Sequence, residues 1–176
     1  MIRSNVVLVG FMGTGKSTVG TLAAARLGWS FVDSDAWIVQ KSGMSIPELF
    51  AERGEAEFRR LETEAIRELL SGKGCVLATG GGAVLSAENR ELMKEGGLVV
   101  ALTASKEAII ERVQGDTNRP LLQGGVEERV TALLEARKGA YDFAEVKIDT
   151  ERLSPEEVAE RIVAAIQGTN REVEQL

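Results

Sequence analysis

The amino-acid sequence predicts an α/β domain built around a parallel β-sheet. Short β-branched runs alternate with longer segments of helical periodicity, which is the pattern of strands connected by crossover helices. Several strand candidates are apolar along their whole length, as strands are when helices cover both faces of a sheet. The chain of 176 residues is long enough to bury one core and too short for two full domains of about 100–200 residues each.

Five segments have the composition of strands. The first, third and fourth are almost continuously apolar and are expected in the sheet interior. In chain order, the predicted strands are Asn5–Gly10, Ser30–Asp33, Cys75–Thr79, Leu98–Thr103 and Glu145–Asp149.

Helical segments fill the connections between these strands. Four of them begin with a serine N-cap that an acidic residue follows within the first turn. These N-caps are Ser45, Ser86, Ser105 and Ser154. The last residues are polar, so we expect a single folded domain over 1–168 and a disordered tail over 169–176.

The composition excludes several classes of function. Lysine and arginine number 21 against 27 for aspartate and glutamate, a net charge of −6, which argues against nucleic acid or an anionic membrane as a partner. The lone cysteine, Cys75, excludes an intrachain disulfide, and the absence of histidine removes a common general base and zinc ligand. No apolar stretch approaches the roughly 18 residues of a membrane span. We therefore expect a cytoplasmic protein with small-molecule partners, and we expect a monomer.

The segment Gly10–Ser17 has the pattern of a phosphate-binding loop. Its residues GFMGTGKS fit G-x-x-x-x-G-K-[ST] and lie between a predicted buried strand and a predicted helix, as that motif requires. Backbone N–H groups of such a loop surround phosphate oxygens, Lys16 is expected to reach the β- and γ-phosphates, and the Ser17 hydroxyl is expected to ligate Mg²⁺. The predicted nucleotide contacts in this loop are Gly13, Thr14, Gly15, Lys16, Ser17 and Thr18.

Two carboxylates follow the second predicted strand. Side chains alternate in extended chain, so Asp33 and Asp35 are expected to point to the same side. Asp33 would then hold the water shell of Mg²⁺, and Asp35 would accept a hydrogen bond or a proton from an acceptor hydroxyl. The alternative is that Asp35 caps a helix starting at Ala36 while Asp33 is merely solvated.

Three consecutive glycines, Gly80, Gly81 and Gly82, follow the third predicted strand. A run without side chains exposes backbone N–H groups and lets a ligand approach closely, although a flexible connection is the alternative. The phosphate loop, the aspartates and the glycine run follow three successive strands. Because the carboxyl ends of parallel strands share one edge of a sheet, the three motifs are expected to form one site.

Two arginines are candidates for binding an anionic acceptor. Arg59 has Glu62 three residues later, within contact distance on a helix. Arg137 and Tyr141 are spaced i and i+4 near the end of a later helix, where they could equally be a charge that complements the helix dipole and a packing aromatic.

A third arginine, Arg119, lies in a segment with little periodicity. Residues 115–125 (GDTNRPLLQGG) have glycines at both ends, which predicts a mobile lid that carries Arg119. The alternative for this segment is an ordinary surface loop.

Seven motifs in order give the chain a family resemblance. They extend from about Asn5 to Ile166 and are GFMGTGKST, FVDSD, EAEFRRLE, TGGG, RPLL, the R-x-x-x-Y of Arg137 to Tyr141, and IDT. Together they resemble the shikimate kinases, whereas the phosphate loop alone indicates only a nucleotide-binding fold. The resemblance implies a three-layer P-loop fold of the nucleoside-monophosphate-kinase type, with a five-stranded parallel sheet in strand order 2-3-1-4-5. It also implies that ATP, with Mg²⁺, phosphorylates the 3-hydroxyl of shikimate to give shikimate 3-phosphate, on the route to chorismate and the aromatic amino acids.

The resemblance also implies roles for individual residues. Lys16, Asp35 and Arg119 would be catalytic, and Ser17 and Asp33 would serve the metal. Glu62 would orient Arg59, Arg119 would close over the phosphates, and Arg112 with Pro155 would hold the adenine. The acceptor region would span about 35–62, and shikimate would be bound by Asp35, Arg59, Gly80, Gly81, Gly82 and Arg137, with both arginines on its carboxylate. One departure is Gly139, at a place where the family often has proline.

Three other functions are weighed against this resemblance. A small-molecule kinase with another acceptor, such as gluconate, would share the phosphate loop but would not need the glycine run together with Arg59 and Arg137. A regulatory GTPase needs an N-K-x-D motif, and the sequence has none. A nucleotide-binding module without transfer activity is expected to lose Lys16 or one of the aspartates, and all are present.

Overall fold

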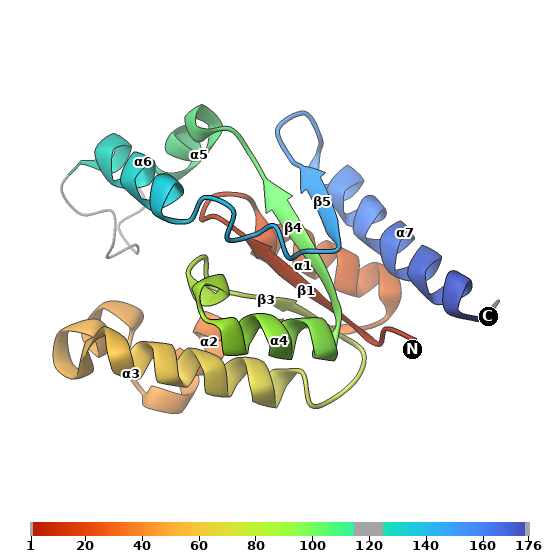
Figure 1. Ribbon diagram of the computed structural model, residues 1–176, viewed down its shortest axis with the longest axis horizontal. Helices are drawn as coiled ribbons and strands as arrows, with labels where there is room; N and C mark the ends of the chain where they lie inside the picture. Colours follow the sequence, from red (N-terminus) through yellow and green to blue (C-terminus); the bar gives the residue numbers. More distant parts are fainter. Residues whose placement is uncertain (1, 115–124, 175–176) are drawn as a thin grey trace.

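A five-stranded parallel sheet forms the centre of the molecule, with strand order β2-β3-β1-β4-β5 (Figure 1). The computed structural model describes residues 2–114 and 125–174. The strands are β1 (Asn5–Gly10), β2 (Ser30–Asp33), β3 (Cys75–Ala78), β4 (Leu98–Thr103) and β5 (Val146–Asp149). The fold class, the five strands and their order agree with the sequence-based predictions, with two strand ends shifted by one residue.

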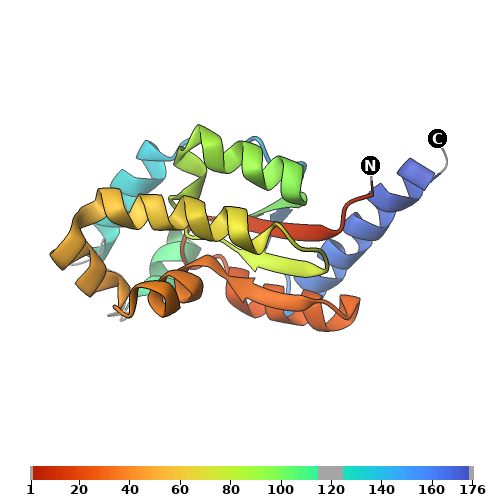
Figure 2. The same cartoon turned by 90° about the horizontal axis from the view of Figure 1, so that it is seen from below.

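Helices cover both faces of the sheet, as the apolar central strands require. The helices are α1 (Lys16–Leu27), α2 (Ser34–Ser42), α3 (Ile46–Leu69), α4 (Ala87–Gly96), α5 (Lys106–Val113), α6 (Val126–Ala136) and α7 (Pro155–Glu174), with a 3₁₀ turn, η1 (Ala83–Leu85). Side chains of β1 alternate between two cores: Val6 and Leu8 pack with α1 and α7, and Val7 and Val9 pack with α3 and α4. Figure 2 shows the resulting three layers.

Two smaller clusters extend beyond the carboxyl edge of the sheet. Helices α2 and α3 pack on each other around Ile38, Leu49 and Leu61. Helices α5 and α6 pack around Ile109 and Val130, together with side chains of the loop after β1. In Figure 1 these two helix pairs lie on opposite sides of the end of the sheet where the strands point. They therefore flank the edge at which the sequence places a site.

Helix α3 is bent at Gly54, which the sequence analysis does not predict. Gly54 has φ 81° and ψ 169°, a conformation that interrupts the helix and that residues with a side chain rarely adopt. The bend separates an N-terminal part that carries Ile46 and Phe50 from a C-terminal part that carries Arg59 and Glu62. All four of these side chains line the same cavity.

The end of the chain differs from the prediction. Helix α7 continues to Glu174, so the expected disordered tail over 169–176 is wrong for Thr169 to Glu174. The reason is a pair of hydrogen bonds to the other end of the chain: the backbone N–H of Arg3 donates to Asn170 Oδ1 at 2.7 Å, and Asn170 Nδ2 donates to the Arg3 carbonyl at 2.9 Å. Within residues 2–114 and 125–174, no helix is both long enough and apolar enough to cross a membrane.

Candidate active site

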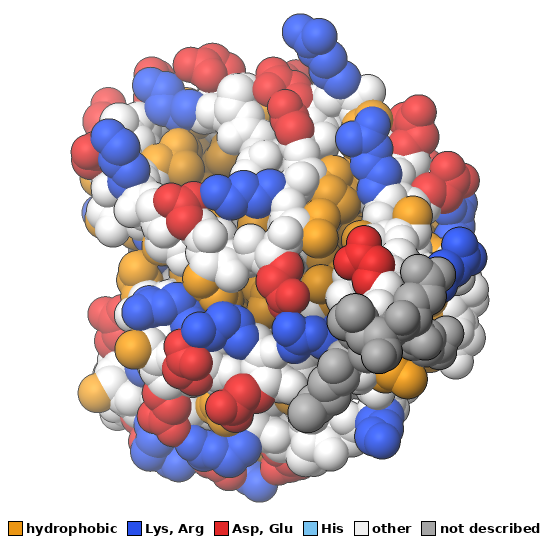
Figure 3. Space-filling model, turned by 45° about the vertical axis from the view of Figure 1, so that its right-hand side comes forward, with side chains coloured by type: hydrophobic (Ala, Val, Ile, Leu, Met, Phe, Trp, Pro, Cys, Tyr) orange, Lys and Arg blue, Asp and Glu red, His pale blue; other side chains and the backbone are white. Residues whose placement is uncertain are grey.

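A cavity of about 430 Å³ opens at the carboxyl edge of the sheet and is lined by residues that follow β1, β2 and β3. The three motifs that the sequence places together therefore do meet. Positive and negative side chains are interspersed on the face drawn in Figure 3. Recognition of an anion thus depends on particular groups inside the cavity rather than on a broad field over that face.

The phosphate-binding loop forms one end of the cavity. Gly15 has φ 86° and leads directly into α1, so the helix begins with a left-handed residue that glycine favours. Lys16 Nζ donates to the carbonyls of Gly10 at 2.7 Å and Phe11 at 3.0 Å, which holds the ammonium group across the loop. Thr18 also lines the cavity, whereas Thr14 is buried within the loop, where its hydroxyl donates to the Phe11 carbonyl.

Asp33 connects this loop to α2. The Ser17 hydroxyl donates to Asp33 Oδ2 at 3.2 Å, and Asp33 Oδ1 accepts the N–H groups of Asp35 and Ala36. The N-cap of α2 is therefore Asp33, so the alternative in which Asp35 caps the helix is wrong. The expectation that both aspartates belong to extended chain is also wrong, because α2 begins at Ser34. Both aspartates nevertheless line the cavity.

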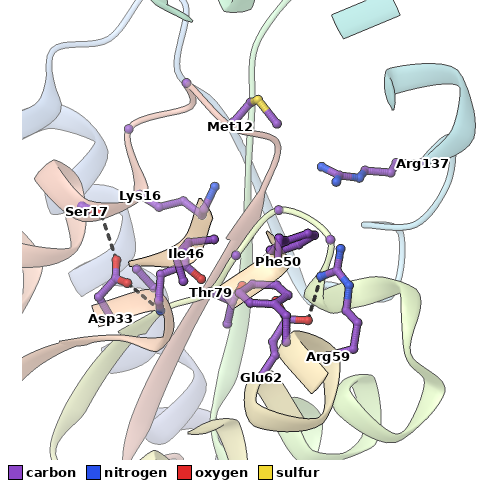
Figure 4. A pocket seen from close by; sticks show the side chains of 18 of the residues that line it. Met12, Lys16, Ser17, Asp33, Ile46, Phe50, Arg59, Glu62, Thr79 and Arg137 are labelled. Carbon is purple, nitrogen blue, oxygen red and sulfur yellow. Dashed lines mark hydrogen bonds and ion pairs between the residues drawn. The ribbon is translucent and has the colours of Figure 1, made fainter. Parts of the chain in front are cut away.

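A buried carboxylate, Glu62, faces the cavity from α3. It is 1% exposed and accepts a hydrogen bond from Arg59 Nη1 on Oε2 at 2.9 Å (Figure 4). Its Oε1 has no hydrogen-bond partner in the part of the chain that the structure describes. Burial raises the pKa of Glu62 above its ordinary value, although the positive charge of Arg59 opposes this increase. A Cβ placed on Gly80 would lie 2.9 Å from Glu62 Oε1 and 3.2 Å from Asp35 Oδ1, so the two acids flank that glycine.

Two guanidinium groups lie close to the other two glycines of the run, Gly81 and Gly82. A Cβ on Gly81 would lie 2.9 Å from Arg137 Nη1, and a Cβ on Gly82 would lie 2.7 Å from Arg59 Nη2. Both values are shorter than a side chain tolerates without movement of the arginine. The absence of side chains in this run therefore lets both arginines reach the cavity, at the end opposite Lys16 and Ser17 (Figure 4).

Arg137 is the most unusual of these groups. Only 5% of the residue is exposed, and its guanidinium carbon lies 5.3 Å from the centre of the Phe11 ring. Its Nε and Nη1 atoms are buried and have no hydrogen-bond partner among the described residues. A buried cation with unsatisfied donors is unfavourable unless a ligand supplies the acceptor, so the geometry points to an anionic ligand at this position.

Two of the remaining predicted residues, Arg112 and Pro155, lie outside the cavity lining. Arg112 Nη1 donates to the Gly13 carbonyl at 3.0 Å and to the Thr150 hydroxyl at 3.2 Å, which places this arginine beside the phosphate loop. Pro155 is the first residue of α7. Arg119 and the predicted lid lie outside the described residues, apart from Gly125, which precedes α6.

The cavity has an apolar wall whose residues the sequence analysis does not name as site residues. Phe50 and Phe58 pack with their ring centres 4.8 Å apart. The wall is formed by Met12, Ile46, Phe50 and Phe58. Ile46 and Phe50 are spaced i and i+4, which is also the spacing of core residues on a helix, so the pattern alone does not separate the two roles.

Comparison with known proteins assigns the chain to a family. The family model described as shikimate kinase matches residues 12–167. A shikimate kinase of Geobacter sulfurreducens is 54% identical over 163 residues, which cover 92% of this chain and 90% of that protein. The chain belongs to the shikimate kinase family. A shikimate kinase of Thermodesulfovibrio yellowstonii is 49% identical over 90% of this chain and 92% of its own.

Solved structures of the shikimate kinase family have the same fold as this member. The shikimate kinase from Acinetobacter baumannii in complex with shikimate matches with a TM-score of 0.90 and 42% identity, covering 95% of this chain and 94% of that chain. A gluconokinase from Sinorhizobium meliloti matches with a TM-score of 0.68 and 22% identity, covering 98% and 97%. The second match indicates a shared fold only. A fold by itself does not determine the acceptor, which depends on the side chains of the cavity.

Proposed function

We propose that this chain transfers the γ-phosphoryl group of ATP to the 3-hydroxyl of shikimate and releases ADP and shikimate 3-phosphate. The observation that carries the proposal is the buried Arg137, with unsatisfied donors, at the same end of the cavity as Arg59. Two planar guanidinium groups at one end of a cavity suit a carboxylate, which each can bind through parallel hydrogen bonds. Shikimate has one carboxylate and a ring of a size that the apolar wall can contact.

The opposite end of the cavity suits the phosphates of ATP. We propose that the backbone of Gly13, Gly15 and the first turn of α1 binds phosphate oxygens, and that Lys16 moves from its carbonyl partners to the β- and γ-phosphates. We propose that Arg112 contacts the adenosine side of the nucleotide, and its hydrogen bond to the Gly13 carbonyl supports this role.

The residues near Ser17 fit Mg²⁺. The Ser17 hydroxyl and the Asp33 carboxylate are oxygen donors 3.2 Å apart, and Mg²⁺ favours oxygen ligands and keeps several waters. Within the described chain, no cluster of three or more acidic or cysteine side chains offers a complete protein cage. Such a cage is not needed, because substrate phosphates complete the shell of this ion in kinases. When bound, Mg²⁺ neutralises charge that develops on the transferred group.

Asp35 is proposed to act on the acceptor hydroxyl. Its carboxylate lines the cavity beside Gly80, on the first turn of α2. From this place it can accept the hydrogen bond of the 3-hydroxyl and orient its oxygen toward the γ-phosphorus. Glu62 supports the other end of the site, where the acceptor carboxylate is proposed to bind, by holding Arg59.

We propose that the enzyme acts as a monomer in the cytoplasm and that its partners are shikimate and ATP.

A coupled assay of ADP release tests the proposed function. The purified protein is supplied with ATP and Mg²⁺ and with shikimate, shikimate methyl ester, gluconate or a nucleoside monophosphate in parallel. We expect turnover with shikimate to exceed turnover with every other acceptor. Equal rates with the ester would remove the role of the carboxylate. Preference for gluconate would identify a different small-molecule kinase, and binding of ATP without turnover on any acceptor would indicate a nucleotide-binding module.

A further inference from the structure

The glycine run is held by two side chains that the proposed reaction does not use. The Tyr141 hydroxyl donates to the Gly81 carbonyl at 2.8 Å. Asn89 Nδ2 donates at 2.9 Å to the carbonyl of Ala83, the residue that follows the run. Tyr141 is half-buried, and Asn89 is 1% exposed. One of these hydrogen bonds is partly buried and the other is buried, and such bonds fix the backbone that they contact.

Tyr141 connects the run to Arg137. Both residues belong to the short segment after α6, where the Ala140 N–H donates to the Arg137 carbonyl at 2.9 Å. The hydroxyl of Tyr141 contacts the same glycine, Gly81, whose missing side chain leaves space for Arg137 Nη1. A shift of Gly81 would therefore change the space available to this guanidinium.

Asn89 connects the run to Arg59 on the other side. The Thr63 hydroxyl donates to Asn89 Oδ1 at 2.7 Å and lies 3.2 Å from the Arg59 carbonyl. Thr63 is one turn after Arg59 on α3. Asn89 on α4 thus joins the backbone after Gly82 to the helix turn that carries Arg59, and Gly82 is the glycine that Arg59 approaches.

We propose that Tyr141 and Asn89 are positioning residues that fix the glycine run as a spacer between Arg59 and Arg137. Tyr141 fixes the position of Gly81 relative to Arg137, and Asn89 fixes the backbone after Gly82 relative to Arg59. The separation of the two guanidinium groups, and with it the binding of the acceptor carboxylate, depends on both side chains. This inference rests on the proposed function, because it assumes that the two arginines bind shikimate.

Steady-state kinetics of Tyr141→Phe, Asn89→Ala and the double variant test the proposal. Tyr141→Phe removes one hydroxyl and keeps the ring, so loss of a single hydrogen bond predicts about a three- to tenfold increase in the KM of shikimate. The KM of ATP should stay within about twofold, because the hydrogen bonds of these side chains among the described residues go to Gly81, Ala83 and Thr63 and not to the phosphate loop. Since both residues act on one run, the effect of the double variant should be smaller than the product of the single effects.

Thr169→Val is the matched control. Its hydroxyl donates to the Ala165 carbonyl at 2.9 Å within α7, so the substitution also removes a hydroxyl–carbonyl bond, in a helix that does not line the cavity. We expect no change in either KM for this variant. Gly81→Ala is a second test, independent of whether Asn89→Ala folds, because the added Cβ 2.9 Å from Arg137 Nη1 should raise the KM of shikimate selectively.

The possible results are distinguishable. A shikimate KM within twofold of the wild-type value in both Tyr141→Phe and Gly81→Ala would overturn the positioning role. A parallel rise of both KM values with a lower Tm would also overturn it and leave a purely structural role. A wild-type protein that fails to phosphorylate shikimate would overturn the proposed function and this inference together, whereas an active wild type with unaltered variants would overturn the inference alone.

Discussion

The substitution Glu62→Gln is predicted to raise the stability of the protein and to weaken shikimate binding, both through the buried ion pair between Glu62 and Arg59. Glu62 is 1% exposed and its pKa is raised, first by burial and also by the neighbouring Asp35 charge, despite the bond from Arg59. The folded environment therefore disfavours the charged carboxylate relative to the neutral acid. Glutamine resembles the neutral acid in shape, so the substitution should remove this unfavourable term and keep an acceptor for Arg59.

The expected effect on stability has a definite sign and pH dependence. Because the pKa of Glu62 is higher in the folded state, the folded protein binds more protons than the unfolded chain, and stability falls as pH rises from about 4.5 through the raised pKa. A stability difference of about 1 kcal/mol moves the Tm of a chain of this size by about 2–4 °C. Glu62→Gln should therefore melt a few degrees higher than wild type at pH 8, and this difference should shrink toward pH 5.

The expected effect on shikimate binding has the opposite sign. In the variant the guanidinium still donates to an amide oxygen, so a charge-assisted hydrogen bond remains while the ion pair is lost, and Arg59 loses about 1–1.4 kcal/mol of restraint. This loss predicts about a five- to tenfold increase in the KM of shikimate, with the KM of ATP unchanged.

Thermal denaturation at several pH values and steady-state kinetics measure both effects. Glu64→Gln is the matched control, because Glu64 lies on the same helix and pairs with Arg60 at 2.9 Å on the exposed side. We expect the control to change Tm and both KM values little. A lower Tm for Glu62→Gln at pH 8 would refute the dominance of burial, and an unchanged KM for shikimate would refute the positioning of Arg59 by Glu62.

Four further substitutions test the proposed roles. Lys16→Ala should abolish turnover and preserve the circular dichroism spectrum, because it removes the charge that faces the β- and γ-phosphates; a folded and fully active variant would contradict the ATP site. Asp35→Asn should lower kcat by about 10²–10⁴ and leave ATP affinity within twofold, as measured by kinetics and calorimetry. Comparable losses in kcat and in ATP affinity would contradict the proposal that Asp35 serves the acceptor while Asp33 serves the metal. Arg59→Lys and Arg137→Lys should each raise the KM of shikimate about ten- to a hundredfold, since lysine lacks the planar pair of donors; wild-type KM values in both would exclude bidentate recognition of a carboxylate.

Much of the fold could be predicted because its signals are local. A continuous apolar run such as Leu98–Leu102 identifies a strand buried on both faces, and the loop before Lys16 identifies its own strand–loop–helix context. The contact between Arg59 and Glu62 follows from helix geometry alone, and it is present at 2.9 Å.

Features that depend on distant contacts could not be predicted. The last turns of α7 are ordered by bonds between Asn170 and Arg3, residues 167 positions apart, so a polar composition was a poor guide there. The bend at Gly54 is one glycine among 19, and no neighbouring residue distinguishes it. The position of Phe50 in the cavity wall could not be predicted, because residues that line a cavity and residues of a core have the same spacing on a helix. Helix α2 starts earlier than the sequence suggests because the Asp33 side chain caps it, and Asp33 itself belongs to a segment with the composition of a strand.

The contact between Tyr141 and Gly81 gives the enzyme a built-in optical reporter. Tyr141 is the sole tyrosine of the chain, so every phenolate absorbance signal in an alkaline titration originates beside the substrate cavity. Burial raises the pKa of this hydroxyl above its ordinary value, and the positive charge of Arg137 opposes the increase. A carboxylate bound to Arg137 would cancel that charge, so shikimate should move the titration to higher pH, and gluconate at the same concentration should move it less. Acceptor binding then becomes visible by ultraviolet absorbance in the unlabelled enzyme, without ATP and without turnover.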